Sequence, residues 1–208
     1  MLESPILKGT LVRLEPLDLR HVVGFTEASS GPRETFKLTG VPLGEESVRQ
    51  WVSQALNLRD AGTAVPFATI DKRSGRIAGA TRFFDIQFWT WAAGSPHQRG
   101  AELPDAVEIG HTWLAAWAQR SGINTEAKLL MLTHAFETWR VHRVRLTTDA
   151  RNLRSRTAIE RLGMRLDGVL RAHHAAYDGA IRDSAFYSML DSEWPSAKEA
   201  LTARLRLD

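Results

Sequence analysis

Residues 107–128 read VEIGHTWLAAWAQRSGINTEAK, and this stretch decides the fold. It begins with a strand-like run that ends at Leu114, passes through a polar turn containing Gly122, and enters an apolar helical pattern. At such a turn, successive backbone N–H groups have no partner within the helix, and the helix dipole adds partial positive charge. The spacing therefore predicts an anion-binding turn, although an ordinary turn capped by Asn124 or Thr125 fits it equally well.

Hydrophobic periodicity extends this pattern in both directions along the 208-residue chain. Strands are predicted at 11–15, 66–70, 76–86, 107–114, 143–148, from 164, and 185–190, and helices from Asp18, at 45–61, 124–139 and 152–162. This order predicts an α/β fold, a mixed sheet of about seven strands flanked by about four helices. Because no repeat or linker interrupts it, we expect residues 1–208 to form a single domain.

Composition narrows the classes of protein. Hydrophobic residues make up 43% and charged residues 25%, which predicts a packed core. The absence of cysteine excludes disulfides, thiolate metal sites and a cysteine nucleophile. The N-terminus lacks a signal-peptide pattern, and no apolar run approaches the length of a membrane span. We therefore expect a cytoplasmic protein with no membrane partner.

The net positive charge of the chain is small, but its arginines are clustered in one segment. The formal charge is only +3, but six arginines fall within residues 140–156: Arg140, Arg143, Arg145, Arg151, Arg154 and Arg156. Such a patch suits a phosphorylated small ligand as well as it suits RNA. Because no aromatic platform is interleaved with these arginines, RNA ranks last among the candidate ligands.

Four motifs now carry a family resemblance. The run Gln119-Arg120-Ser121-Gly122-Ile123-Asn124 resembles the acetyl-CoA loop of the GNAT superfamily, Q/R-x-x-G-x-G/A, with Asn124 at the last position. Residues 121–128 look like the variant of one RimJ/RimL-like group. The segments 152–164 (Asn-x-x-Ser, then Gly-Met), 178–183 and 11–17 also match the family, in the correct order. The resemblance covers residues 7–195 and identifies the chain as similar to RimJ/RimL-type N-acetyltransferases.

The resemblance implies a fold in which two central strands splay apart and acetyl-CoA lies between them, with no metal required. Pantetheine would bond to backbone at Trp113 and Leu114, like an added strand. The pyrophosphate would lie on the turn made by Gln119, Arg120, Ser121, Gly122, Ile123, Asn124 and Thr125. Asn152 and Arg154 complete the implied acetyl-CoA contacts, and Arg151 and Arg156 are further candidates for CoA phosphates.

The implied reaction is transfer of the acetyl group to a primary amine by direct attack in a ternary complex. Such a reaction needs a base for the amine and a proton source for the thiolate. Glu108 is our candidate base, and His111 is an alternative. Glu108 could instead be a solvated or ion-paired glutamate without a catalytic role. Ser155 is the candidate proton donor, although Asn152 and Ser155 could simply cap a helix.

The acceptor is the open question. A protein N-terminus or a small-molecule amine fits the resemblance, and residues 29–44 and 87–105 are expected to set specificity. Trp89 and Trp91 are candidates for covering the substrate or for a homodimer contact. The rival function is a non-catalytic acyl-CoA-binding protein of the same fold, which would keep the turn but tolerate loss of Glu108 and Ser155.

Overall fold

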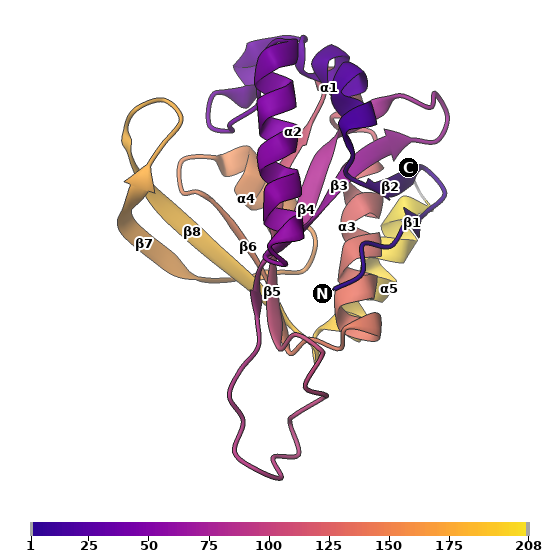
Figure 1. The fold of residues 1–208 in the computed structure, drawn as a ribbon. Helices are drawn as coiled ribbons and strands as arrows, with labels where there is room; N and C mark the ends of the chain where they lie inside the picture. Colours follow the sequence, from indigo (N-terminus) through magenta and orange to yellow (C-terminus); the bar gives the residue numbers. More distant parts are fainter. Residues whose placement is uncertain (1, 207–208) are drawn as a thin grey trace.

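The computed structural model describes residues 2–206 and shows one mixed sheet with helices on both faces (Figure 1). Within these residues the strands are β1 (Leu7–Lys8), β2 (Val12–Pro16), β3 (Ala64–Asp71), β4 (Ile77–Gln87), β5 (Ala106–Leu114), β6 (Arg143–Asp149), β7 (Arg165–Ala175) and β8 (Ile181–Leu190). The α-helices are α1 (Val22–Ser29), α2 (Glu45–Asp60), α3 (Ile123–Thr133), α4 (Leu153–Glu160) and α5 (Trp194–Leu205). The predicted mixed α/β architecture is confirmed.

The strands lie in the order β1-β2-β3-β4-β5-β6-β8-β7. All neighbouring pairs are antiparallel except β5 and β6, which are parallel. Every residue of β3 is buried, as expected for a strand covered on both faces. Helix α2 packs on β3 through the buried face of Val48, Val52 and Ala55, which recur at helical spacing.

The sheet opens at its centre. Strands β5 and β6 pair only as far as Glu108 and Arg145, and then they part. Ala80 of β4 lies opposite Trp113 of β5, whereas Arg82 of β4 lies opposite Gly110 of β5. Strand β5 therefore holds one extra residue there. That residue is His111, with a φ of 47°. A β-bulge bends its strand and re-aims its side chains, and here it coincides with the place where the two strands diverge.

Four details of the prediction need correction. The sheet has eight strands and the described residues form five α-helices, because β1 and α5 were missed. Strand β1 is too short to show alternation, and α5 buries little more than Trp194 and Leu201. The predicted helix 124–139 is α3 followed by a π-helical segment, His134–Thr138. Helical spacing predicts an apolar face of Leu19, Val22, Val23 and Thr26 in the first helix, and this was partly wrong, since Val23 is 65% exposed.

Within residues 2–206, no helix combines the length and the apolar character that a membrane span requires.

Candidate active site

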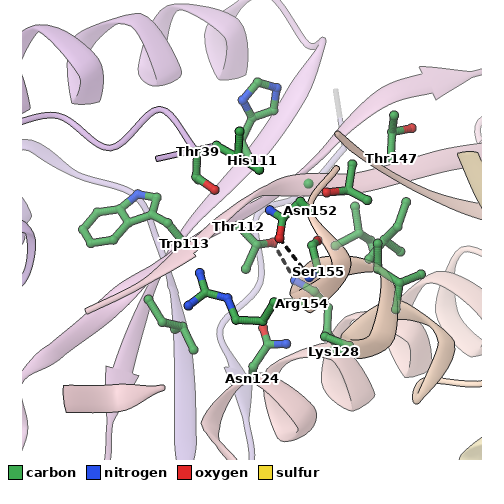
Figure 2. A pocket seen from close by; sticks show the side chains of 18 of the residues that line it. Thr39, His111, Thr112, Trp113, Asn124, Lys128, Thr147, Asn152, Arg154 and Ser155 are labelled. Carbon is green, nitrogen blue, oxygen red and sulfur yellow. Dashed lines mark hydrogen bonds between the residues drawn. The ribbon is translucent and has the colours of Figure 1, made fainter. Parts of the chain in front are cut away.

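A single continuous cleft of about 2070 Å³ starts at the turn before α3 and reaches the β7–β8 hairpin. It is lined by the diverging ends of β5 and β6, by the start of α4 and by residues 35–40. Figure 2 shows side chains from β5, α3 and α4 converging on one part of this pocket. The cleft brings together the predicted acetyl-CoA loop, Glu108, Asn152 and Ser155.

The turn before α3 exposes backbone N–H groups. Gly122 is the N-cap of α3 and is left-handed, with a φ of 73°, and no side chain caps the helix. The alternative of a cap by Asn124 or Thr125 is therefore wrong. Two side chains brace the turn: Ser121 Oγ donates to Ala118 O at 2.6 Å, and Gln119 Nε2 donates to Leu114 O at 3.0 Å. The result is a helix N-terminus without a side-chain cap, a geometry that suits an anion.

Cations surround this end of the cleft, which we call the turn end. Those that line it are Arg120, Lys128, Arg154, Arg161 and Arg204. Arg154 donates to Gln119 Oε1 at 3.1 Å and to Thr35 O at 2.6 Å, so its guanidinium is fixed beside the turn. The other two arginines predicted for phosphate are engaged elsewhere. Arg151 pairs with Asp149 and Asp178, and Arg156 donates to the hydroxyl of Tyr187.

Asn152 and Ser155 lie at the start of α4, facing the cleft. Asn152 Oδ1 accepts a hydrogen bond from the backbone N–H of Ser155 at 3.1 Å, which makes Asn152 the N-cap (Figure 2). The capping role considered for Asn152 is thus confirmed. The cap also holds the Ser155 side chain beside the divergence of β5 and β6, where a proton donor would be needed.

Trp113 and Leu114 form the end of β5 along the cleft. Most of the Trp113 ring is covered by neighbouring aromatic side chains. It is 4% exposed and packs against Phe25, Phe36 and Trp51. Past Glu108, β5 no longer pairs with β6, so the backbone of this stretch faces the cleft rather than a strand. This arrangement suits the predicted backbone role and not a side-chain role.

Lys128 was not predicted as a site residue. It lies on α3, is 2% exposed, and lines the cleft from below β5. Its Nζ donates to Thr112 Oγ1 at 2.7 Å and to Thr81 Oγ1 at 3.1 Å. Burial lowers the pKa of this ammonium to about 7. The sequence signal was a lysine within an otherwise apolar helical run, which reads equally well as a solvated side chain.

Glu108 stands where β5 and β6 separate. Its Oε2 is bound by Arg145, with Nε at 2.6 Å, and Arg145 also pairs with Asp85 at 2.7 Å. The ion-paired reading of Glu108 is therefore correct. Its Oε1 lies 3.8 Å from the place where a Cβ at Gly110 would stand, on the side of the bulge. A Cβ at Gly110 would meet the Phe84 ring at 2.7 Å, so the glycine lets this ring pack closely against β5.

His111 shares the bulge and packs edge-on against Phe84, with ring centroids 5.0 Å apart. The His111 side chain is exposed on the wall of the open cleft, with other protein groups close around it. Desolvation by these groups, together with the charges of Arg82, Arg182 and His174, lowers its pKa to about 4. His111 is consequently neutral at pH 7 and can accept a hydrogen bond.

The loop 87–105 lies outside the cleft, at the opposite end of β5 (Figure 1). Asp105 organises it: its carboxylate accepts from Trp89 N at 2.6 Å and from Trp91 Nε1 at 2.9 Å. His142 stacks on Trp89 at 5.7 Å. The geometry of one chain therefore gives no support to a substrate role for Trp89 and Trp91, and the homodimer contact stays a prediction.

The β7–β8 hairpin supplies the end of the cleft that sequence reasoning missed. We call it the hairpin end. Strand β7 holds extra residues between Leu170 and His174, and Ala172 there has a φ of 48°. This bulge turns His173 toward Ser184, at 3.0 Å. Such irregularity has no periodic sequence signal, because the unpaired residues interrupt the alternation that would reveal a strand.

Comparison with known proteins decides the family. Residues 11–165 match the family described as Acetyltransferase (GNAT) domain. The chain belongs to the GNAT acetyltransferase family. A GCN5-related N-acetyltransferase from Brucella melitensis has 30% sequence identity and a TM-score of 0.84, covering 98% of this chain and 86% of that one. RimJ from Mycobacterium smegmatis, solved with CoA-disulfide, shares the fold at 23% identity, with a TM-score of 0.75 and coverage of 96% and 91%.

One curated relative matches over a shorter stretch. YdaF of Bacillus subtilis (strain 168), which carries a provisional ribosomal N-acetyltransferase name, is 35% identical over 93 residues. This match covers 44% of the chain and about half (49%) of YdaF. The similarity to RimJ/RimL-type GNAT proteins expected from the motifs is confirmed.

Proposed function

We propose that the protein is an acetyl-CoA-dependent N-acetyltransferase that acts on a primary amine by direct transfer in a ternary complex. The observation that carries this proposal is the coincidence, in one cleft, of an uncapped helix N-terminus ringed by cations and a strand bulge with an adjacent carboxylate. The names of YdaF and the RimJ and RimL structures favour a protein N-terminus as acceptor. A small-molecule amine remains the other class.

The residues of the turn end fit acetyl-CoA. The N–H groups of residues 120–125 and the Arg154 guanidinium would hold the pyrophosphate. Arg161 and Arg204 lie further along the same wall and would meet the remaining phosphate. The unpaired backbone of Trp113 and Leu114 would bond to the pantetheine amides. Acetyl-CoA, when bound, supplies the acetyl group as an activated thioester.

Residues of the chain would then carry out two proton transfers, one from the acceptor amine and one to the leaving sulfur. Glu108 Oε1, on the bulge side, would accept a proton from the acceptor amine, directly or through water. Arg145, on Oε2, keeps this carboxylate oriented. The Ser155 hydroxyl, positioned by Asn152, would provide a proton to the departing sulfur. His111, being neutral, is the alternative proton acceptor.

The first test is calorimetric titration of acetyl-CoA into the wild type and Gly122→Trp. Gly62→Trp is the matched control, because Gly62 has the same φ of 73°, lies outside the cleft and has nothing within 4 Å. We expect micromolar binding by the wild type and the control, and loss of binding in Gly122→Trp, with all three equally folded by circular dichroism. Absence of wild-type binding would sink the proposal.

The second test measures release of free CoA thiol with a panel of amines. Glu108→Gln should lower kcat by about 100-fold or more and Ser155→Ala by about tenfold, with little change in acetyl-CoA affinity. Exposed Glu27→Gln serves as the control. Tight acetyl-CoA binding without thiol release from any amine would instead favour the non-catalytic acyl-CoA-binding protein.

A further inference from the structure

The hairpin end of the cleft has its own charge pattern, which bears on the acceptor. It is formed by the bulge at His111, by His173, His174 and Arg182 of the hairpin, and by Tyr177. Tyr177 closes it, because its ring lies directly against Gly40 of the α1–α2 segment, where a Cβ would clash with the ring. This end lies next to Glu108 and opposite the turn end, so it is where an acceptor would lie if the proposed function holds.

Each carboxylate that lines the cleft already has an arginine partner. Asp85 and Glu108 share Arg145, and buried Asp149 is bound by Arg151 at 2.7 Å. Together these are the three acidic residues of the lining. An incoming cationic amine therefore finds one carboxylate oxygen of Glu108 directed at the bulge, but no unpaired acidic cluster.

Two guanidinium groups near this end lack such partners. Arg182 lines the cleft, whereas Arg82 lies behind the lining, in a small neighbouring cavity that His111 also borders. Among residues 2–206, neither Arg82 nor Arg182 has a carboxylate within ion-pair distance. Arg182 Nε donates to Ser184 Oγ at 3.0 Å, which aims the guanidinium without neutralising it. Arg82 lies over the Phe84 ring at 5.3 Å, and its buried Nε finds no acceptor in the described residues.

Both cations lie close to the bulge at which transfer would occur. His111 contacts Phe84, which carries Arg82 on its face, and the charges of Arg82 and Arg182 both act on the His111 ring. His174 pairs in register with Arg182 and contributes a third nitrogen-bearing side chain. The hairpin end thus has the Arg182 guanidinium in its lining and the Arg82 guanidinium close behind it, next to His111.

We propose that the acceptor carries an anionic group, a carboxylate, within one or two residues of the reacting amine, and that Arg182 binds it while the nearby charge of Arg82 adds to the attraction. Guanidinium groups recognise carboxylates through paired, charge-assisted hydrogen bonds. Free amino acids and peptide N-termini followed by an acidic residue share this chemistry. Polyamines and aminoglycosides lack it and would face two uncompensated cations. This inference rests on the proposed function and names its substrate class.

The test compares acids with matched amides in the thiol-release assay. One arm uses the twenty L-amino acids against their amides, and the other uses Ser-Glu peptides against Ser-Gln peptides, which separates free amino acids from peptide N-termini. We expect at least a tenfold higher kcat/KM for the carboxylate form in one arm. Arg182→Gln should abolish this preference by lowering kcat/KM for the carboxylate forms at least tenfold. Arg171→Gln, on the exposed outside of β7, should retain it.

Binding provides a readout independent of turnover. N-acetyl amino acids, N-acetyl peptides and their amide counterparts are titrated into CoA-loaded protein by calorimetry. A carboxylate preference that Arg182→Gln removes supports the inference even if no thiol is released. Equal rates and equal affinities for acids and amides overturn the inference and leave acetyl transfer standing. Failure of acetyl-CoA itself to bind overturns the proposed function, and the inference with it.

Discussion

Helix α3 carries two buried charges two residues apart, and they hold two different regions of the molecule. Glu126 reaches the turn between β1 and β2, where its carboxylate accepts from Thr10 N, Leu11 N and Val12 N at 2.7, 2.6 and 2.7 Å. Lys128 reaches the divergence of β5 and β6, where its partners are two neutral threonine hydroxyls. The two residues are 6% and 2% exposed, so burial alone does not distinguish them.

The difference lies in how each charge is compensated. Three backbone N–H groups replace the water that Glu126 gives up, so this charge can remain buried at little cost. Lys128 has no anion among the described residues, and burial lowers its pKa to about 7. The compensated charge of Glu126 stabilises the contact between α3 and the β1–β2 turn. The uncompensated Lys128 is instead a group beside the cleft that changes charge near neutral pH.

The largest effect should come from breaking the Glu126 region. Glu126→Ala removes the acceptor of three largely buried donors, and we expect a loss of about 4 kcal/mol in the free energy of unfolding. Urea denaturation measures this loss, with exposed Glu27→Ala as the control, expected to cost less than about 0.5 kcal/mol. Equal midpoints for the two variants would show that the Glu126 contacts contribute nothing to stability.

At Lys128, we expect the free energy of unfolding to depend on pH, and removal of the side chain to matter less than its protonation state. Because burial lowers the pKa from 10.5 to about 7, the unfolded chain binds a proton that the folded chain releases between these values. Wild-type stability should therefore rise with pH in this window, by up to about 1.4 kcal/mol per pH unit from this group.

Lys128→Met should remove this dependence. The Thr81–Thr112 hydrogen bond at 2.9 Å remains available, so we expect the variant to be at least as stable as the wild type at pH 7. The wild type should gain up to about 3 kcal/mol relative to the variant between pH 7 and 9. Exposed Lys8→Met is the control. Parallel pH curves for the wild type and Lys128→Met would mean that the lysine titrates normally.

Asp105 extends the comparison, since it is another buried acid whose carboxylate accepts hydrogen bonds. Trp91→Phe removes the indole donor to Asp105 Oδ1, and we expect a loss of about 1 kcal/mol in stability. Because the loop lies outside the cleft, acetyl-CoA affinity by calorimetry should stay within about twofold. A large loss of affinity without unfolding would return this loop to the active site.

The smallest effect is expected for His111 near neutral pH. With a pKa of about 4, its protonation should leave no step in the pH–rate profile between pH 6 and 8. Nitrogen-15 NMR of the imidazole should give a midpoint near 4. Arg182→Gln should raise that pKa, because one of the flanking positive charges is removed. A wild-type midpoint near 6.5 would remove the evidence that Arg82 and Arg182 act on this ring.

Part of this arrangement could be predicted from sequence. The turn at 119–125 and the helix that follows it were recognised because caps, glycines and periodicity are local properties. Asn152 was identified as an N-cap for the same reason. The hairpin end was not foreseen, since Arg182, His173 and Tyr177 meet the cleft only through strand pairing with a bulge. Arg82 looked like an ordinary strand residue.

The roles of single residues depended still more on packing. Glu126 and Lys128 both belong to the run that resembles the RimJ/RimL-like loop, yet nothing in their spacing distinguishes them. Trp89 and Trp91 were placed near the acceptor because a long aromatic loop is usually functional. Their position was decided by the direction in which β5 leaves the loop, which carries them away from the cleft.

The sequence by itself determined the mixed α/β fold, the order of nearly all its elements and the turn at 119–125. These follow from short-range physics: the periods of helices and strands, helix caps, and a glycine at a left-handed position. The GNAT family was identified separately, from the resemblance of its motifs. The tertiary structure alone decided which charges are compensated, because an ion pair or its absence depends on residues distant in the chain. It brought Arg145 to Glu108, left Arg82 and Arg182 without an ion-paired carboxylate among residues 2–206, and placed Lys128 against Thr112, the residue after His111.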